Sequence, residues 1–154
     1  MRPPSLLFVC LGNICRSPLA EAAFRDAAAR AGLEAVADSA GTGGWHAGHA
    51  PDPRSRAVAL RHGIDISGLR ARAVRDADFT GFDYILALDP QNLRDLRAMA
   101  PARSSARIAL LMDHVPGRAG QAVHDPYYGG DADFDAVWDQ VRAAADALVA
   151  MLQR

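Results

Sequence analysis

The sequence predicts an α/β fold: a single domain with a four-stranded parallel sheet flanked by helices on both faces. The candidate strands are residues 5–9, 34–39, 84–88 and 107–112, and the first and third are almost entirely apolar, as buried parallel strands are. Helical patterns alternate with these strands, which favours parallel pairing. The chain of 154 residues is long enough for one substantial core, and no linker, repeat or low-complexity tract divides residues 1–154.

Four helices are predicted from start signals and apolar periodicity, over residues 18–30, 53–62, 91–99 and 133–152. Ser17, Asp52 and Asp89 each stand directly before a Pro and are the predicted N-caps of the first three. The last helix has an apolar stripe that includes Trp138, which is therefore predicted to lie in the core. A further helical turn is predicted at residues 76–80.

Composition argues against several functional classes. The formal net charge of −1 gives no electrostatic footprint for nucleic acid. No apolar run approaches the roughly 20 residues of a membrane span, and the start of the chain does not resemble a signal peptide. A cytoplasmic protein without membrane insertion is the expectation. The two Cys residues, Cys10 and Cys15, form neither a disulfide framework nor a zinc motif.

The most informative stretch links the first strand to the first helix and contains both Cys residues. Its backbone N–H groups and the following helix N-terminus can surround an anion, and Arg16 can bind two phosphate oxygens. Cys10 is the candidate nucleophile, because a thiol beside a cation and a helix N-terminus is held as the reactive thiolate. The candidate phosphate-binding residues are Leu11, Gly12, Asn13, Ile14, Cys15 and Arg16.

Two nucleotide-binding loops do not fit this stretch. A Walker-type loop ends in Gly-Lys-Ser/Thr, and the chain contains no Lys. A dinucleotide-binding fingerprint needs GxGxxG, of which only Gly12 is present.

A general acid is also needed to release an alkoxide or phenolate from phosphorus. Three Asp-Pro pairs compete, at Asp52, Asp89 and Asp125. The first two are explained as helix N-caps. The pair at Asp125 is followed by Tyr-Tyr-Gly-Gly, which cannot start a helix. Asp125 is therefore the predicted acid, and Asp89 is the alternative because it also follows a strand.

Aromatic and polar residues near these groups are the remaining site candidates. Trp45, in a Gly-rich loop, and Tyr127 and Tyr128, beside Asp125, are predicted to form walls for an aromatic substrate. The presence of Asn13 is explained by the turn alone, because Asn tolerates the left-handed backbone conformation. Besides its role as a cap, Ser17 can donate a hydrogen bond from its hydroxyl to the Cys10 thiolate. The His residues show no metal-ligand spacing, so no metal site is predicted.

These motifs resemble those of the low-molecular-weight protein tyrosine phosphatases, and the similarity spans nearly the whole chain. The matching segments are Cys10 to Pro18, which is similar to the family's signature loop, Asp125 to Gly129, which is similar to the segment that carries its general acid, and Asp38 to Thr42, Pro51 to Arg54 and Asn92 to Leu96. The presence of Trp45 favours a bacterial member of the animal-like subgroup.

The resemblance implies a phosphocysteine mechanism without metal or organic cofactor. Cys10 would attack phosphorus, Arg16 would bind the phosphoryl oxygens, and Asp125 would act as acid and then base. Asn13 and Ser39 would hold the loop, Ser17 would stabilise the thiolate, and Cys15 would form a reversible disulfide with Cys10 that prevents overoxidation.

The implied partners are phosphotyrosine proteins, with a bacterial tyrosine kinase and a host protein both left open. Secretion into a host is also left open. A monomer is expected, with a weak dimer as the alternative.

Two positions depart from the family patterns. Gly68 stands about where animal enzymes have a His that contributes to the Asn network, so that hydrogen bond is missing or replaced. Arginine phosphatases of the same fold tend to have Thr where this chain has Ile14, which argues against phosphoarginine.

Two other functions remain as alternatives. A thiol-coupled arsenate reductase needs further cysteines, and none follows position 15. A redox or anion-binding module would leave Asp125 and the aromatic residues unexplained.

Overall fold

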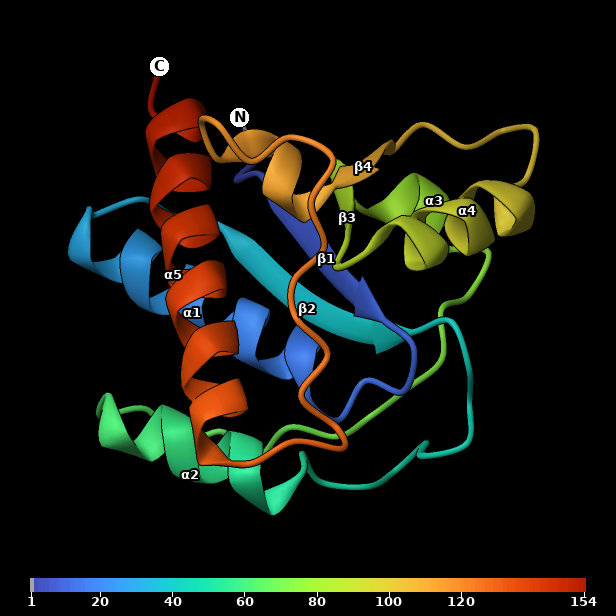
Figure 1. Ribbon diagram of the computed structural model, residues 1–154. Coiled ribbons are helices and arrows are strands. Elements are labelled where there is room, and N and C mark those ends of the chain that lie inside the picture. Colours follow the sequence, from blue (N-terminus) through green and yellow to red (C-terminus); the bar gives the residue numbers. More distant parts are fainter. Residues whose placement is uncertain (1) are drawn as a thin grey trace.

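The computed structural model describes residues 2–154 and shows a four-stranded parallel sheet (Figure 1). The strands are β1 (Ser5–Cys10), β2 (Val36–Gly41), β3 (Tyr84–Ala87) and β4 (Arg107–Leu110), in the order β2-β1-β3-β4. All three neighbouring pairs are parallel, which confirms the predicted fold class. The chain leaves β1 for β2 on one side and later places β3 on the other. The loop after β1 therefore lies at the switch point of the sheet, where ligands of such folds bind.

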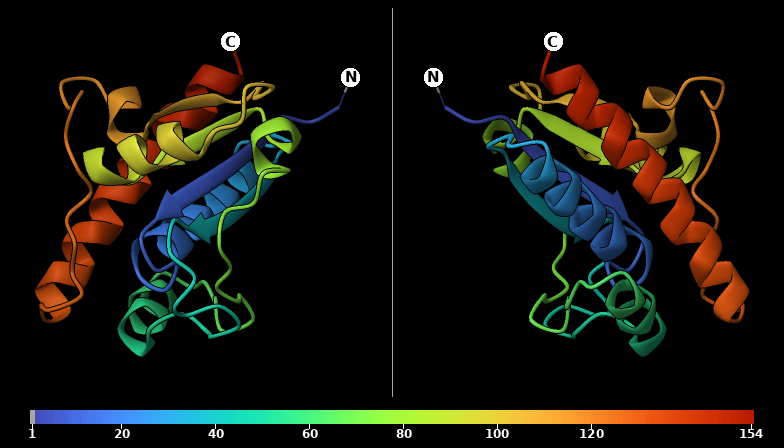
Figure 2. Two further views of the ribbon diagram at one scale, coloured as in Figure 1. Left: turned by 90° about the vertical axis from the view of Figure 1, so that its right-hand side faces the viewer. Right: turned by 90° about the vertical axis from the view of Figure 1, so that its left-hand side faces the viewer.

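Helices cover both faces of the sheet, as predicted (Figure 2). On one face, the β1 side chains of Leu6 and Phe8 share a core with α1 (Arg16–Arg30), α2 (Pro53–Arg61) and α5 (Asp131–Leu152). The alternate residues of β1 belong to a second core on the opposite face. That core includes side chains from α3 (Asp78–Gly81) and α4 (Pro90–Met99). Trp138 of α5 is only 2% exposed, which confirms its core position.

Helix starts follow the predicted caps at two of three places. Asp52 Oδ1 accepts the Arg54 N–H at 2.8 Å, and Asp89 Oδ1 accepts the Asn92 N–H at 2.7 Å. The predicted cap at Ser17 is wrong, because α1 begins at Arg16 and its N-cap is Cys15. Ser17 lies inside the helix, and its hydroxyl binds groups of the preceding loop in place of helix N–H groups.

Other boundaries differ from the prediction by one or two residues; β2, for example, covers residues 36–41 and not 34–39. Strand β4 ends at Leu110, and the chain continues as a short 3-10 helix, η1 (Leu111–His114). Helix α5 starts at Asp131, two residues before the predicted position, after the Gly130 N-cap. Apolar residues continue past the end of β4, so the apolar pattern cannot mark where the strand ends.

Candidate active site

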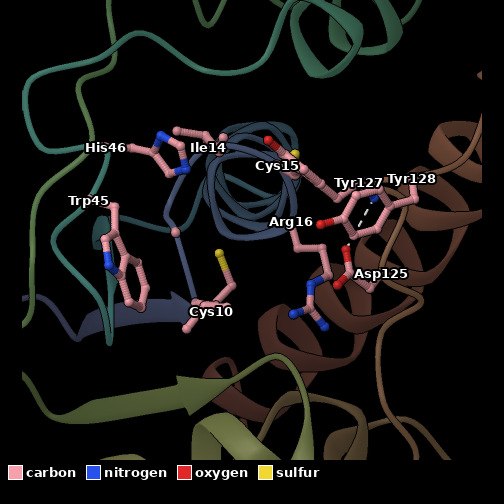
Figure 3. Close-up of a pocket in the computed structure, with 11 residues that line it drawn as sticks. Cys10, Ile14, Cys15, Arg16, Trp45, His46, Asp125, Tyr127 and Tyr128 are labelled. Atoms are coloured by element: carbon pink, nitrogen blue, oxygen red, sulfur yellow. Dashed lines mark hydrogen bonds between the residues drawn. The ribbon is translucent and has the colours of Figure 1, made fainter.

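A cavity of about 270 Å³ opens at the carboxyl end of β1 (Figure 3). It is lined by Cys10, Leu11, Gly12, Ile14, Cys15, Arg16, Trp45, His46, Asp125, Tyr127 and Tyr128. Figure 3 shows Trp45 and His46 on one side of Cys10, and Arg16, Asp125 and Tyr127 on the other. The structure therefore brings together residues that lie more than a hundred positions apart in the sequence.

Cys10 is the last residue of β1, and its side chain is almost completely buried at the cavity floor. Its Sγ lies 3.0 Å from Ser17 Oγ and 3.3 Å from the backbone nitrogen of Asn13. Both groups can donate to a thiolate, and the N-terminal end of α1 adds positive potential at the same place. The loop is therefore built to stabilise negative charge on sulfur.

Asn13 holds the loop through hydrogen bonds of its whole amide group. Its φ of 58° lies in the left-handed region, which Asn tolerates better than most residues. Its Nδ2 donates to Ser17 Oγ at 2.8 Å and to Ser39 Oγ at 3.0 Å. Its Oδ1 accepts the backbone N–H of Arg72 at 3.0 Å. That backbone group supplies the third hydrogen bond of the amide, and Gly68 takes no part in the network.

Arg16 is buried beneath the cavity, with 5% of its surface exposed. Its Nη1 donates to Val123 O at 3.0 Å and forms an ion pair with Asp89 Oδ2, at 2.9 Å. Within residues 2–154, its Nε and Nη2 form no hydrogen bond to the protein. The guanidinium is thus fixed at one nitrogen and keeps donors available for two oxygens of a bound phosphate.

Asp89 and Asp125 have different surroundings, although both were candidates for the general acid. Asp89 caps α4 with one carboxylate oxygen and pairs with Arg16 through the other, and it does not line the cavity. Asp125 lines the cavity, and its Oδ1 accepts only the N–H of Tyr127, at 3.1 Å, among residues 2–154. The pairing of Asp89 with Arg16 was missed from the sequence, since nothing in the local pattern links the two.

All three predicted aromatic residues line the cavity, but their exposure differs. Trp45 is 71% exposed, Tyr127 is 41% exposed and Tyr128 is 96% exposed. The indole packs over Gly43, where an added Cβ would lie 1.7 Å from the ring. Gly43 thus lets the indole fold back over the loop. The two tyrosine rings pack edge to face, with 5.0 Å between their centroids, and form the opposite rim of the cavity.

His46 is a cavity residue that sequence reasoning missed. Its ring lies directly against residues 11–15 between β1 and α1, which we call the phosphate loop. A Cβ added to Gly12 in this loop would be 3.0 Å from His46 Cδ2. The only sequence signal was its position next to Trp45 in a Gly-rich loop.

The two cysteines differ in their environment. Burial raises the pKa of Cys15 to about 12, and the negative charge of Asp52 adds to this effect. Cys15 is therefore a neutral thiol at physiological pH. Both cysteines are free in the structure.

Residues 2–154 contain neither a cluster of metal-ligating side chains nor a helix that could span a membrane. These residues contain no group of three His, Cys, Asp or Glu side chains that could hold a metal ion. Every helix among them is too short or too polar to cross a membrane.

Comparison with known proteins assigns the chain to a family. Residues 5–154 match the family described as low molecular weight phosphotyrosine protein phosphatase. The low molecular weight protein-tyrosine-phosphatase YfkJ of Bacillus subtilis is 45% identical over 152 residues, which cover 97% of this chain and 96% of that protein. The chain belongs to the low molecular weight phosphotyrosine protein phosphatase family. The predicted enzyme class, a protein-tyrosine phosphatase, is thereby confirmed.

Similarity to this family extends to animal members and to solved structures. The human low molecular weight phosphotyrosine protein phosphatase is 44% identical over 140 residues, covering 88% of this chain and 87% of that protein. The crystal structure of Bacillus subtilis YfkJ superposes with a TM-score of 0.91 over 99% of this chain and 96% of that chain. A Drosophila arginine phosphatase superposes equally well, with a TM-score of 0.91 at 30% identity, over 97% of this chain and 98% of that chain. The fold alone thus does not define the phosphorylated group.

Proposed function

We propose that this phosphatase hydrolyses phosphotyrosine and related aryl phosphates through a phosphocysteine intermediate on Cys10. One observation carries the proposal: the Cys10 thiol, the available donors of Arg16 and the Asp125 carboxyl line the same small cavity. A nucleophile, an anion-binding group and a proton donor are the three parts that phosphoryl transfer to a thiol requires.

In the first step, the Cys10 thiolate attacks phosphorus as the bond to the phenolic oxygen breaks. Arg16 and the N–H groups of residues 11–16 bind the three non-bridging oxygens, whose charge is maintained in the transition state. Protonated Asp125 gives its proton to the departing phenolate. The products are a phosphocysteine, a phenol and an Asp125 carboxylate.

In the second step, the Asp125 carboxylate takes a proton from a water molecule as its oxygen attacks phosphorus. The sulfur–phosphorus bond breaks and returns the electron pair to Cys10 as thiolate. Ser17 and the Asn13 N–H stabilise this leaving thiolate, because both lie within hydrogen-bond distance of its sulfur. Inorganic phosphate is released, and Asp125 is again protonated.

The walls of the cavity support an aromatic leaving group. Trp45 on one side and Tyr127 on the other supply faces for a flat ring, which gains from area burial and ring contacts. Ile14 adds an apolar side chain close to the phosphate loop, where a guanidinium substrate would need polar partners. We therefore assign phosphotyrosine, and not phosphoarginine, as the substrate class.

The test measures hydrolysis of phosphotyrosine peptides and aryl phosphates at mildly acidic pH. We expect vanadate-sensitive turnover that is lost in Cys10→Ser. In Asp125→Asn it should fall by about 10²- to 10⁴-fold, the usual contribution of a general acid. The matched control is Asp131→Asn, an exposed Asp at the start of α5 that does not line the cavity. Full activity of Cys10→Ser, or a preference for phosphoarginine, would contradict the proposal.

We also infer a regulatory and cellular setting. Cys15 lies in the same loop as Cys10 and is proposed to form a reversible disulfide with it after oxidation. A free-thiol nucleophile works in a reducing compartment, which supports the proposal of a cytoplasmic enzyme. We also propose that the enzyme is bacterial and acts on phosphotyrosine proteins as a monomer. Cell fractionation and gel filtration measure the location and the size.

A further inference from the structure

The segment that carries Asp125 is held at both ends by side chains from other elements. We call residues 123–130 the acid loop. At its start, the Val123 N–H donates to Leu88 O at 2.8 Å, and Val123 O accepts Arg16 Nη1 at 3.0 Å. Near its end, Arg54 Nη2 donates to Tyr127 O at 2.9 Å and Arg54 Nη1 donates to Gly129 O at 3.0 Å. The path of this loop is therefore set by long-range contacts.

Asp125 itself has almost no contacts that fix its carboxyl group. Its one hydrogen bond within residues 2–154 is the local bond from the Tyr127 N–H, at 3.1 Å. The direction of the carboxyl therefore depends on the backbone of the acid loop. Any group that anchors this backbone near Asp125 controls the position of the proton donor.

His124 provides such an anchor directly before Asp125. Its Nε2 lies 2.7 Å from Asp133 Oδ1, and because a carboxylate only accepts hydrogen bonds, Nε2 is the donor. Its backbone N–H also donates to Gln140 Oε1 at 2.8 Å. Both acceptors belong to α5. His124 thus joins the acid loop to the first turns of a long, well-packed helix.

Asp133 connects the two ends of the acid loop through one carboxylate. Its Oδ2 accepts the Gly130 N–H at 2.8 Å, while Oδ1 accepts the His124 ring. These hydrogen bonds, from Gly130 first and then from His124, lower the pKa of Asp133, so it is charged at neutral pH. One carboxylate therefore closes the loop on both sides of Asp125.

We propose that His124, through its hydrogen bond to Asp133, is a positioning residue that holds the Asp125 carboxyl at the leaving-group oxygen. The inference rests on the proposed function, in which Asp125 donates that proton. The His124 and Asp133 side chains are 47% and 37% exposed, and an exposed pair of this kind adds little to stability. Its main effect is on the geometry of proton transfer, to which small displacements matter greatly.

The dependence of rate on the leaving group separates positioning from general damage. When proton transfer is impaired, the departing phenolate carries more negative charge, and the loss grows with the pKa of the phenol. A phenol of low pKa leaves readily without a proton. A variant that is merely less folded loses activity equally for every substrate.

The experiment measures kcat/KM for a series of aryl phosphates whose phenols have pKa values from about 7 to about 10. For His124→Ala we expect about a tenfold loss with phenyl phosphate and less than about a twofold loss with p-nitrophenyl phosphate, since only the first needs the acid strongly. His124→Gln keeps an N–H that can reach Asp133. Its kcat/KM should therefore depend on the pKa of the phenol as that of the wild type does. The matched control is Arg61→Ala, which removes another exposed pair to α5, at Asp135, and should leave the dependence unchanged.

Two results would overturn the inference: full activity of His124→Ala with every substrate, or an equal loss with all of them. Melting temperatures of the variants show whether each protein is folded. Failure of the wild-type enzyme to hydrolyse any aryl phosphate would instead overturn the proposed function.

Discussion

Cys10 and Cys15 lie at the two ends of one loop, but their surroundings differ and suit different roles. Ser17 and the Asn13 N–H point at Cys10 Sγ, whereas burial and the charge of Asp52 raise the pKa of Cys15 to about 12. Oxidants react with thiolates, so we expect Cys10 to be the primary target and Cys15 to be the resolving partner. In that reaction the sulfenic acid of Cys10 and the Cys15 thiol give a disulfide and water.

We predict that Cys15→Ser converts reversible inactivation into permanent loss. After a short peroxide treatment, wild-type activity should largely return with a thiol reductant, because the disulfide protects Cys10 from the sulfinic step. The variant has no resolving thiol and should recover only a minor part. Recovery assays, with mass spectrometry of the Cys10 peptide, measure both outcomes. Equal recovery of the two proteins would contradict the assigned role of Cys15.

At the scale of elements, α4 contributes to the site through its N-cap. One oxygen of Asp89 caps the helix at the Asn92 N–H, and the other pairs with Arg16. The carboxyl end of β3 and the start of α4 thereby position a guanidinium from α1. The prediction that Asp89 is a cap is confirmed, and the same carboxylate also holds Arg16.

The two tasks of Asp89 can be separated by substitution. Asn is as good an N-cap as Asp, so Asp89→Asn should retain stability while kcat/KM for aryl phosphates falls by about tenfold through a misoriented Arg16. Asp89→Ala should lose the same activity and also about 1 kcal/mol of stability with the cap. Urea unfolding and steady-state kinetics on both variants test this. A fully active Asp89→Asn would show that Arg16 needs no partner.

For the whole molecule, a buried polar chain links α1 and β2 to the phosphate loop. Glu21 is 1% exposed, and its Oε1 accepts the Ser39 hydroxyl at 2.9 Å. Ser39 in turn accepts from Asn13, which shapes the loop. Arg25 Nε, on the helix surface, binds the other oxygen of Glu21 at 2.9 Å. Burial raises the pKa of Glu21 above its ordinary 4.5 in spite of these partners.

This buried carboxyl predicts a pH dependence of stability. Above pH 4.5 the unfolded chain releases the Glu21 proton while the folded protein still holds it, so the free energy of unfolding falls as pH rises through that window. Glu21→Gln keeps the acceptor for Ser39 and cannot titrate. Relative to this variant, the wild type should therefore lose stability from pH 4.5 upwards. Urea unfolding of both proteins between acidic and neutral pH measures the difference, and parallel curves would contradict it.

The sequence by itself determined the class of fold, two helix caps and the family. Strand and helix periods, Asp before Pro, and the spacing of Cys10, Gly12 and Arg16 are local patterns. Local sterics and hydrogen bonding are enough to turn such patterns into strands, capped helices and a tight loop. The nearness of Asp125 to Cys10 also followed, from helix-cap logic and from the resemblance. The periods and the caps need no knowledge of how distant segments meet. The place of Asp125 does need it, and there the resemblance supplied it.

Only the tertiary structure decided how the phosphate loop is supported. Ser17 was misplaced as a cap because its competing partners, Cys10 and Asn13, become available only when the loop closes. The pairing of Arg16 with Asp89, and that of His124 with Asp133, depend on the packing of helices against the sheet. For Ser17 and Asp89 the sequence offered only a local explanation, the helix cap. The buried or half-buried contacts of the folded chain supplied their other partners.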